Sequence, residues 1–101
     1  MNARLALVTC PNETKAREIA QELVQNGLAA CVNILPGIVS IYRWKGSVET
    51  ESECLMVIKT TKAKTTALEA RILELHPYEN PEFLALSPEY VTPKYLSWLE
   101  S

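Results

Sequence analysis

Residues 38–60, IVSIYRWKGSVETESECLMVIKT, decide the fold because they contain two extended segments on either side of a tight turn. The first segment runs from Ile38 to Trp44. The second runs from Val48 to Thr60 and alternates with unusual regularity. Glutamates at 49, 51 and 53 point to one face, and the smaller side chains at 50, 52 and 54 point to the other. Gly46 lies between the segments and marks the turn. The stretch therefore predicts a long β-hairpin.

The turn sets which side chains face one another across this hairpin. A two-residue loop of Gly46 and Ser47 would suit a type II′ turn, which takes glycine in its first position. The register that follows places Trp44 opposite Glu49, Tyr42 opposite Glu51 and Ser40 opposite Glu53. One face of the hairpin would then carry both aromatic rings and the row of carboxylates.

The row of Glu49, Glu51 and Glu53 has two interpretations. It is either a solvated face, or a surface that recruits positive charge, from a hard cation or from Arg43 or Lys45 of a neighbouring subunit. Adjacent carboxylates oppose one another's ionisation unless a positive charge pairs with them. Because so long a hairpin cannot all be covered by the helices of one domain, we expect it to protrude or to pair with another subunit.

The chain before the hairpin predicts a strand, a helix and a second strand. Leu5 to Thr9 is an apolar run of strand length, and Asn12 is a suitable N-cap. The next residues have apolar side chains at helical spacing as far as Asn26-Gly27, which ends the helix. Leu28 to Ile34 is then typical of a covered strand, and Pro36-Gly37 interrupts it.

The chain after the hairpin predicts a helix, a short strand and a last helix. The second helix spans Lys62 to Leu75 and stops at His76, because Pro77 disfavours helical geometry in the residue before it. Phe83 to Leu86 is expected to be a short buried strand. Thr92-Pro93 starts the last helix, with threonine as N-cap and proline in the first helical position.

The order of elements predicts one α+β domain over residues 1–101. A β-α-β-β-α-β order with a terminal helix gives the ferredoxin-like sandwich, in which both main helices cover one face of an antiparallel sheet. No helix is then left for the other face of the sheet. Its apolar alternation predicts that oligomerisation buries it.

Composition excludes two classes of partner. The formal net charge is −2 and the ten Lys and Arg residues form no basic face, so a nucleic-acid partner is not expected. No run of about 20 apolar residues exists, so no membrane span is expected. The odd number of cysteines (Cys10, Cys31 and Cys54) and the absence of a signal segment predict reduced thiols and a cytoplasmic location.

Several motifs occur in one order along the chain, namely residues 29–34, 42–46, 59–61, 76–82 and 95–99. In these motifs the sequence resembles the CutA family of divalent-cation-tolerance proteins over essentially its whole length. The resemblance implies a tight homotrimer whose architecture is like that of the PII signalling proteins. It also implies tolerance to copper and other divalent metals, a binding function and no established catalytic activity.

The resemblance further implies a copper site, formed by a thiol on the first strand and two successive histidines. Here Val8 occupies the position of that thiol and Leu75 the position of the first histidine, so only His76 matches. Cys10 lies two residues along the first strand, on the same face, and is the candidate substitute.

We therefore expect the metal ligands, for Cu²⁺ or another divalent ion, among His76, Cys10 and Cys31, with Glu79 or a neighbouring subunit completing the set. Each residue also has a purely structural interpretation. His76 would cap the helix that it ends, and the thiols would be core residues. No organic cofactor is predicted.

A second group of residues predicts a small-molecule site. Lys59, Tyr42, Trp44, Tyr78 and Glu79 would line a cleft between subunits that accepts a small anion or a nucleotide-like ligand. This is the alternative function, a PII-like sensor, and interface packing is its structural counterpart. An enzyme is not expected, since Thr9 to Asn12 lacks the arginine that an acylphosphatase cradle needs.

Overall fold

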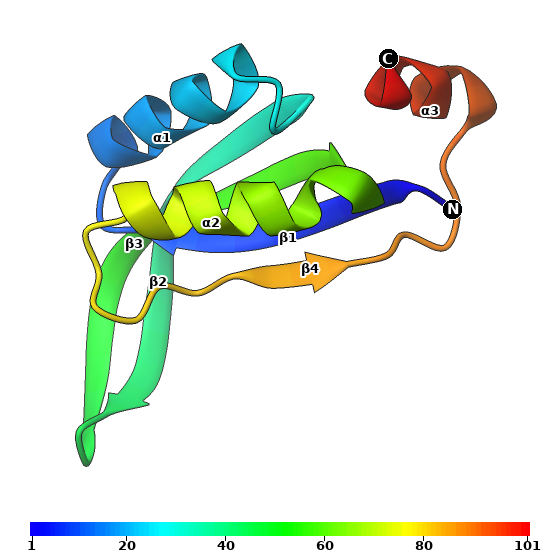
Figure 1. The fold of residues 1–101 in the computed structure, drawn as a ribbon. Coiled ribbons are helices and arrows are strands. Elements are labelled where there is room, and N and C mark those ends of the chain that lie inside the picture. Colours follow the sequence, from blue (N-terminus) through cyan, green and yellow to red (C-terminus); the bar gives the residue numbers. More distant parts are fainter.

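Seven regular elements alternate along the chain in the computed structural model, which describes residues 1–101 (Figure 1). They are β1 (Ala3–Cys10), α1 (Glu13–Gln25), β2 (Cys31–Trp44), β3 (Ser47–Thr61), α2 (Thr65–Leu75), β4 (Leu84–Leu86) and α3 (Pro93–Glu100). A 3₁₀ turn over Lys62–Lys64 leads directly into α2. The predicted order of strands and helices is therefore confirmed.

The strands form one antiparallel sheet in the order β2-β3-β1-β4. This arrangement of a β-α-β-β-α-β chain is the ferredoxin-like one, in which the two outer strands follow the two helices. α1 and α2 pack on the same face of the sheet, and side chains from β1 and β3 meet them there. The α+β class predicted from the sequence is confirmed.

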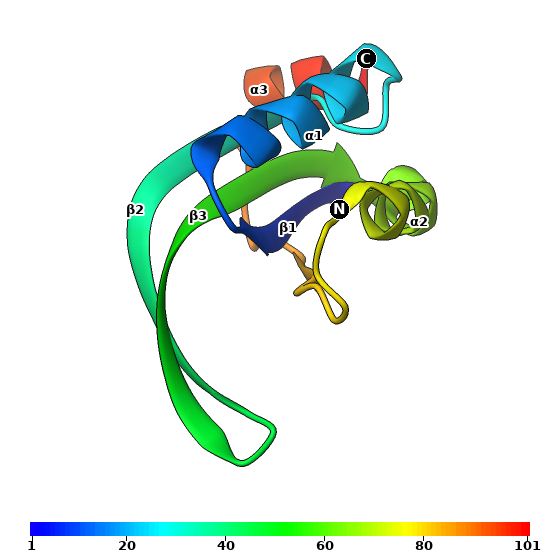
Figure 2. The same ribbon diagram turned by 90° about the vertical axis from the view of Figure 1, so that its left-hand side faces the viewer.

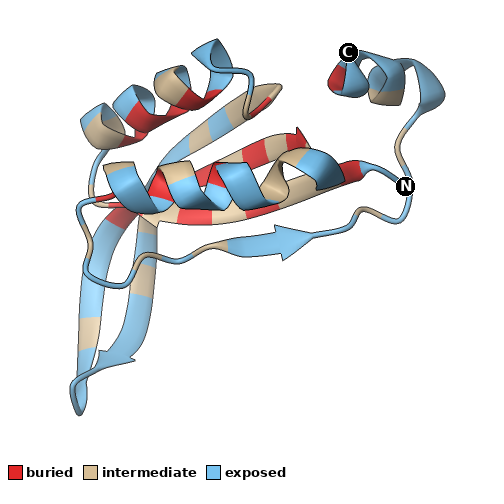
Figure 3. Ribbon diagram, in the orientation of Figure 1, coloured by how far each residue is buried: buried red, intermediate tan, exposed pale blue.

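The core lies between these helices and the sheet (Figure 3). Along β1 and β3 the fully buried residues are every second one, because successive side chains of a strand point to opposite faces of the sheet. In α1 and α2 they recur at helical spacing, because such residues share one face of a helix. The largest of them are Val8, Ile19, Leu23, Met56, Ile58, Leu68 and Ile72. Cys10 and Cys54 belong to the same cluster, on neighbouring strands.

Local chemistry sets where the two main helices begin and end. Asn12 caps α1, since its side-chain oxygen accepts a hydrogen bond from the Lys15 backbone N–H at 2.8 Å. Gly27, with φ +70°, supplies the left-handed residue that leads the chain out of α1. α2 ends at His76, whose backbone is extended (φ −76°, ψ 136°) because Pro77 follows it.

The hairpin differs from its predicted register by two residues. Lys45 (φ 49°) and Gly46 (φ 85°) both have positive φ, which defines a type I′ turn with these two residues at its tip. Trp44 therefore faces Ser47, Tyr42 faces Glu49 and Ser40 faces Glu51. A lysine seldom adopts left-handed geometry, so the sequence contains no signal for this turn.

β2 is continuous through Pro36-Gly37, where two separate strands were expected. The register with β3 shifts between Leu35 and Ile38, so the chain accommodates these residues as a bulge with Gly37 at φ +76°. Beyond the bulge the hairpin extends past the helices and curves (Figure 2). The domain is consequently elongated, 44 × 26 × 23 Å.

The sheet face away from α1 and α2 is open and apolar over its centre. Leu5 and Leu7 of β1 face Leu86 and Leu84 of β4 there, and Val57 of β3 continues the row. β4 was predicted to be buried, but it is an edge strand, and Leu84 and Leu86 are 54% and 47% exposed. We call this surface the open face.

α3 covers only one end of the open face. Its buried residue, Leu99, lines a small cavity together with Ala3 and Leu5 of β1. The prediction that no helix reaches this face is therefore wrong at that end.

Candidate functional site

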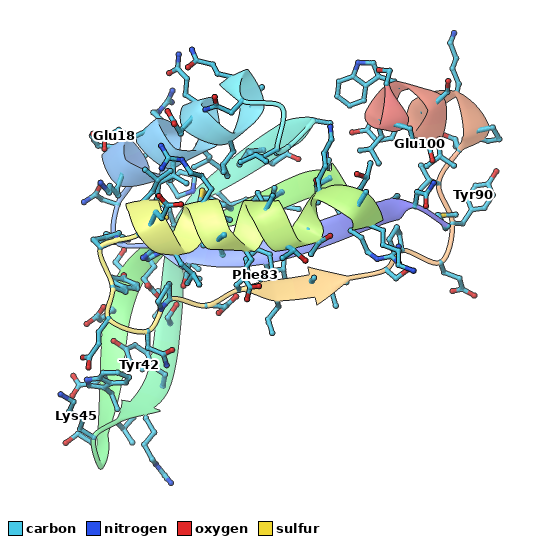
Figure 4. All side chains as sticks on the ribbon, in the orientation of Figure 1. Glu18, Tyr42, Lys45, Phe83, Tyr90 and Glu100 are labelled. Carbon is cyan, nitrogen blue, oxygen red and sulfur yellow. The ribbon has the colours of Figure 1, made fainter.

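A cleft of about 880 Å³ lies between the hairpin and the segment that follows α2. The hairpin contributes residues from both of its strands, among them the labelled Tyr42 (Figure 4), and the segment contributes Tyr78 to Glu82. The carboxylates that line it are Glu49, Glu51, Glu53, Glu79 and Glu82. We call this region the acidic cleft.

Glu53 is the most buried carboxylate of the cleft, with 6% of its surface exposed. Its Oε2 accepts a hydrogen bond of 2.6 Å from the Tyr78 hydroxyl. Burial and the Glu53 carboxylate together raise the pKa of Tyr78, so the phenol remains a donor. The bond ties the segment after α2 to the base of the hairpin.

No ion pair neutralises a carboxylate of the acidic cleft. The ion pairs of the chain lie within or between α1 and α2, and none includes a cleft carboxylate. Arg43 is the one basic residue in the lining.

The negative charge of the cleft also affects its titratable groups. Loss of solvent and the charge of Glu53 raise the pKa of Glu82. Partial burial and the Glu51 carboxylate raise the pKa of Tyr42. The cleft thus concentrates negative charge.

His76 lies directly behind the floor of the cleft and is buried. Its Nδ1 accepts a hydrogen bond from the Tyr78 backbone N–H at 3.1 Å, so Nδ1 carries no proton. Its Nε2 lies 2.7 Å from the Thr9 carbonyl oxygen and therefore donates its proton there. Both ring nitrogens are engaged, and His76 joins the end of α2 to the end of β1.

Cys10 is brought close to His76, while Cys31 is not. Cys10 Sγ lies 3.8 Å from His76 Nε2. Cys31 faces Lys59, which lies five residues along β3 from Cys54, the partner of Cys10. Cys31 is therefore displaced from Cys10 by about 17 Å along the strand direction and lies two strands away across the sheet. Cys31 was predicted as a third ligand, and the fold puts it at the far end of the sheet.

The Cys10–His76 pair fits a copper-type ion in distance but not in chemistry. Bonds of about 2.3 Å to sulfur and 2.0 Å to nitrogen would separate tetrahedral ligands by about 3.6 Å, near the value observed. Burial, with Cys54 and Glu53 nearby, raises the pKa of the Cys10 thiol to about 11, whereas a metal takes the thiolate. His76 Nε2 carries a proton, and no group of three potential ligands exists in the subunit.

The predicted small-molecule residues are divided between two places. Tyr42, Trp44, Tyr78 and Glu79 do meet, in the acidic cleft. Lys59 lies instead at the opposite end of the open face, with its ammonium 6.0 Å from the centre of the Tyr95 ring. Glu82 was missed as a cleft residue, because only the path of the chain after α2 brings it to the hairpin.

Fold and site together define a class of protein, a ferredoxin-like α+β domain with a long hairpin over an acidic cleft. Residues 4–101 match the family described as CutA1 divalent ion tolerance protein. The chain belongs to this family. The comparisons below agree with that assignment over nearly the whole domain.

The relatives include proteins from bacteria and animals. A divalent-cation tolerance protein CutA from Thermus thermophilus is 47% identical over 94% of this chain and 92% of its own length. Protein CutA of Mus musculus is 51% identical over 93% of this chain, which spans only 53% of that protein. The structure of CutA from Xylella fastidiosa superimposes with a TM-score of 0.96 and 42% identity, over 99% of this chain and 96% of that one.

These relatives are named for tolerance of divalent cations and not for a reaction. One is named chloroplastic and another periplasmic, so the names do not support a single location. The expected cytoplasmic location therefore stays a prediction. None of the helices has the length and apolar character that crossing a membrane requires.

Proposed function

We propose that the chain binds divalent cations through the carboxylates of the acidic cleft and acts in tolerance of them as a homotrimer. The observation that carries the proposal is the burial of Glu53. Only 6% of its surface is exposed, and no cationic side chain forms an ion pair with its carboxylate. A buried charge of this kind is costly unless a positive charge compensates it.

The arrangement of the carboxylates supports a cation as that compensating charge. Four further glutamates line the same cleft. Because no three acidic, histidine or cysteine side chains lie close enough together in one subunit to hold an ion, a neighbouring subunit would complete the ligand set. Carboxylate oxygens suit hard and borderline divalent ions, whereas copper in its reduced form prefers thiolates. The copper-type site at Cys10 and His76 is the weaker proposal, since both groups hold their protons and Cys31 is remote.

Calorimetric titration with Mn²⁺, Zn²⁺ and Cu²⁺ tests the proposal. The variant Glu51→Gln/Glu82→Gln removes two cleft charges, and Glu18→Gln/Glu74→Gln removes two charges from the helices as a matched control. We expect the cleft variant to bind at least tenfold more weakly and the control to bind like the wild type. Equal binding by all three proteins would exclude the acidic cleft, and a loss of Cu²⁺ binding only in His76→Ala would favour the other site.

The trimeric part of the proposal is supported by the open face. Leu84 and Leu86 are half exposed on the short edge strand β4, beside Leu5 and Leu7. Apolar surface of this kind on a sheet is normally buried against another chain. A trimer would place the acidic cleft beside a neighbouring subunit, which is the arrangement that the family resemblance implies.

The second candidate function is a PII-like sensor of a small molecule. The observation that favours it is the cavity beneath α3, whose mainly apolar lining includes Lys59 and Tyr95 and no carboxylate. That cavity lies at the opposite end of the open face from the acidic cleft, so the two functions do not compete for one site.

A further inference from the structure

The two oxygens of the Glu53 carboxylate have different surroundings. Oε2 accepts the hydrogen bond of 2.6 Å from the Tyr78 hydroxyl, and Oε1 makes no hydrogen bond within the chain. No fully buried side-chain oxygen or nitrogen lacks a partner. Oε1 must therefore keep contact with the open space of the acidic cleft, which Glu53 lines. A buried carboxylate thus presents one oxygen to a ligand.

The Tyr78 phenol is itself held in place by His76. The His76 Nδ1 accepts a hydrogen bond from the Tyr78 backbone N–H at 3.1 Å. The two rings lie 4.8 Å apart at an angle of 55°, within the range at which aromatic rings pack. On its other side the histidine donates from Nε2 to the Thr9 carbonyl oxygen at 2.7 Å. Because His76 is buried and bonded on both sides, it fixes where the phenol lies.

The number of oxygens that a carboxylate offers separates two kinds of divalent cation. Ca²⁺ takes about six to eight oxygens at about 2.3–2.6 Å and often binds a carboxylate through both oxygens. Mg²⁺ takes about six ligands at about 2.0–2.1 Å in near-ideal octahedral geometry. Mn²⁺ likewise accepts octahedral oxygen ligands. A carboxylate with a single free oxygen therefore suits the smaller ions.

From this geometry we infer that Tyr78 sets the ion selectivity of the acidic cleft, and that His76 is a positioning residue that acts through Tyr78. With the phenol on Oε2, Glu53 binds an ion through Oε1 alone, which disfavours Ca²⁺ relative to Mn²⁺. A phenol is protonated at neutral pH, so Tyr78 can donate whether or not an ion is present. The inference rests on the proposed function, because it names which divalent cations the cleft accepts.

This role gives the buried histidine a function that needs no bond to a metal. Its Nδ1 lone pair is used by the Tyr78 N–H, and its Nε2 carries a proton, so neither nitrogen is free as a ligand. Removal of His76 would instead let the Tyr78 ring turn away from Glu53. Both carboxylate oxygens would then be available in the cleft.

Calorimetric titration of the full chain with Mn²⁺ and with Ca²⁺ tests the inference. We expect the wild type to bind Mn²⁺ at least about tenfold more tightly than Ca²⁺. Tyr78→Phe should reduce this ratio at least about fivefold, because the second oxygen of Glu53 becomes available to Ca²⁺. The ratio is the readout, since a loss of stability alone would weaken the binding of both ions. Tyr90→Phe removes a hydroxyl from an exposed residue outside the cleft and should keep the wild-type ratio.

Substitutions of His76 test its positioning role. His76→Asn keeps a hydrogen-bond acceptor near the place of Nδ1 and should keep the wild-type ratio. His76→Ala removes the acceptor and should shift the ratio in the same direction as Tyr78→Phe. The double variant His76→Ala/Tyr78→Phe should shift it no further than Tyr78→Phe does, because His76 acts through the phenol. Additive shifts would show that His76 does not act through Tyr78.

Two results separate the inference from the proposed function. An unchanged ratio in Tyr78→Phe, or wild-type binding of Ca²⁺ as tight as that of Mn²⁺, would overturn the inference and leave the cation site in place. Absence of Mn²⁺ binding from the wild type would reject the cation site itself, and the inference with it. Tyr78→Phe keeps the buried histidine, so it decides the inference even where His76→Ala does not fold.

Discussion

At the scale of single residues, the Glu53–Tyr78 hydrogen bond joins the hairpin to the segment after α2. Glu53 was recognised from the sequence as one of a row of glutamates, but its burial was not. Burial depends on Tyr78 and on the chain beyond it, which reach the hairpin only in the folded domain. The same holds for His76, whose two partners, Thr9 and Tyr78, come from β1 and from the segment after α2, far apart in the sequence.

The first prediction concerns this hydrogen bond. Tyr78→Phe should lower the free energy of unfolding by about 1–3 kcal/mol, because it leaves a buried carboxylate without its donor. Urea denaturation at neutral pH measures the change. Tyr90→Phe, which removes a hydroxyl from a residue 70% exposed, is the control and should change it by less than about 0.5 kcal/mol. Equal effects of the two substitutions would contradict this role of Glu53.

The second prediction concerns the Cys10 thiol, whose pKa is raised from 9.0 to about 11. The folded state holds this proton more tightly than the unfolded state, so the stabilisation is complete below pH 9 and is lost as the pH rises through 11. The loss should reach about 2 kcal/mol. Urea denaturation between pH 8 and 11 should show the full loss in the wild type and in Cys31→Ala, and a smaller loss in Cys10→Ala, where only the raised pKa values of Tyr78 and Tyr42 still act, above about pH 10. An unchanged pH dependence in Cys10→Ala would show that other groups cause the loss.

At the scale of elements, the sequence predicted the order of helices and strands, because most have a clear period and a clear stop, but it divided β2 in two at Pro36-Gly37. Asn12, Pro77 and Thr92-Pro93 are strong local signals, and the helices begin or end where they stand. The turn and the exposure of β4 were predicted wrongly for a different reason. The geometry of Lys45 and the position of β4 at the sheet edge depend on the twist and pairing of distant strands, which no local pattern records.

The third prediction concerns the turn of the hairpin. Gly46→Ala should destabilise the hairpin by about 1 kcal/mol, because an alanine resists φ of +85°. Lys45→Asn should have the opposite, smaller effect, since asparagine followed by glycine favours the type I′ turn. Amide hydrogen exchange of the hairpin measures both changes, and Ser47→Ala is the control. Faster exchange in Lys45→Asn than in Gly46→Ala would contradict the assigned turn.

At the scale of the whole molecule, the open face has charged sites at its two ends and apolar residues between them. The apolar alternation of the strands predicted that this face needs a partner, and the exposure of Leu84 and Leu86 agrees with that expectation. Which residues form each end could not be predicted, because the hairpin register was displaced by two residues and α3 covers one end. The proposed assembly follows from the face as a whole.

The fourth prediction concerns this assembly. The wild type should have about three times the mass of one 11.3 kDa chain by size exclusion with light scattering. Leu84→Glu should reduce the mass to that of one chain, because it puts a charge on the open face. Leu73→Glu changes a leucine of similar exposure, 51% against 54%, on the outer side of α2, and should remain assembled. A monomeric wild type, or equal masses for the two variants, would contradict the proposal.

The position of a bound ion decides whether the acidic cleft binds a divalent cation. Crystals of the full chain grown with Mn²⁺ allow this, since the anomalous scattering of the metal marks its site. We expect a peak in the cleft, from an ion bound by Glu53 and its neighbouring glutamates. A peak at the Cys10–His76 pair, or no peak in the cleft, would contradict it.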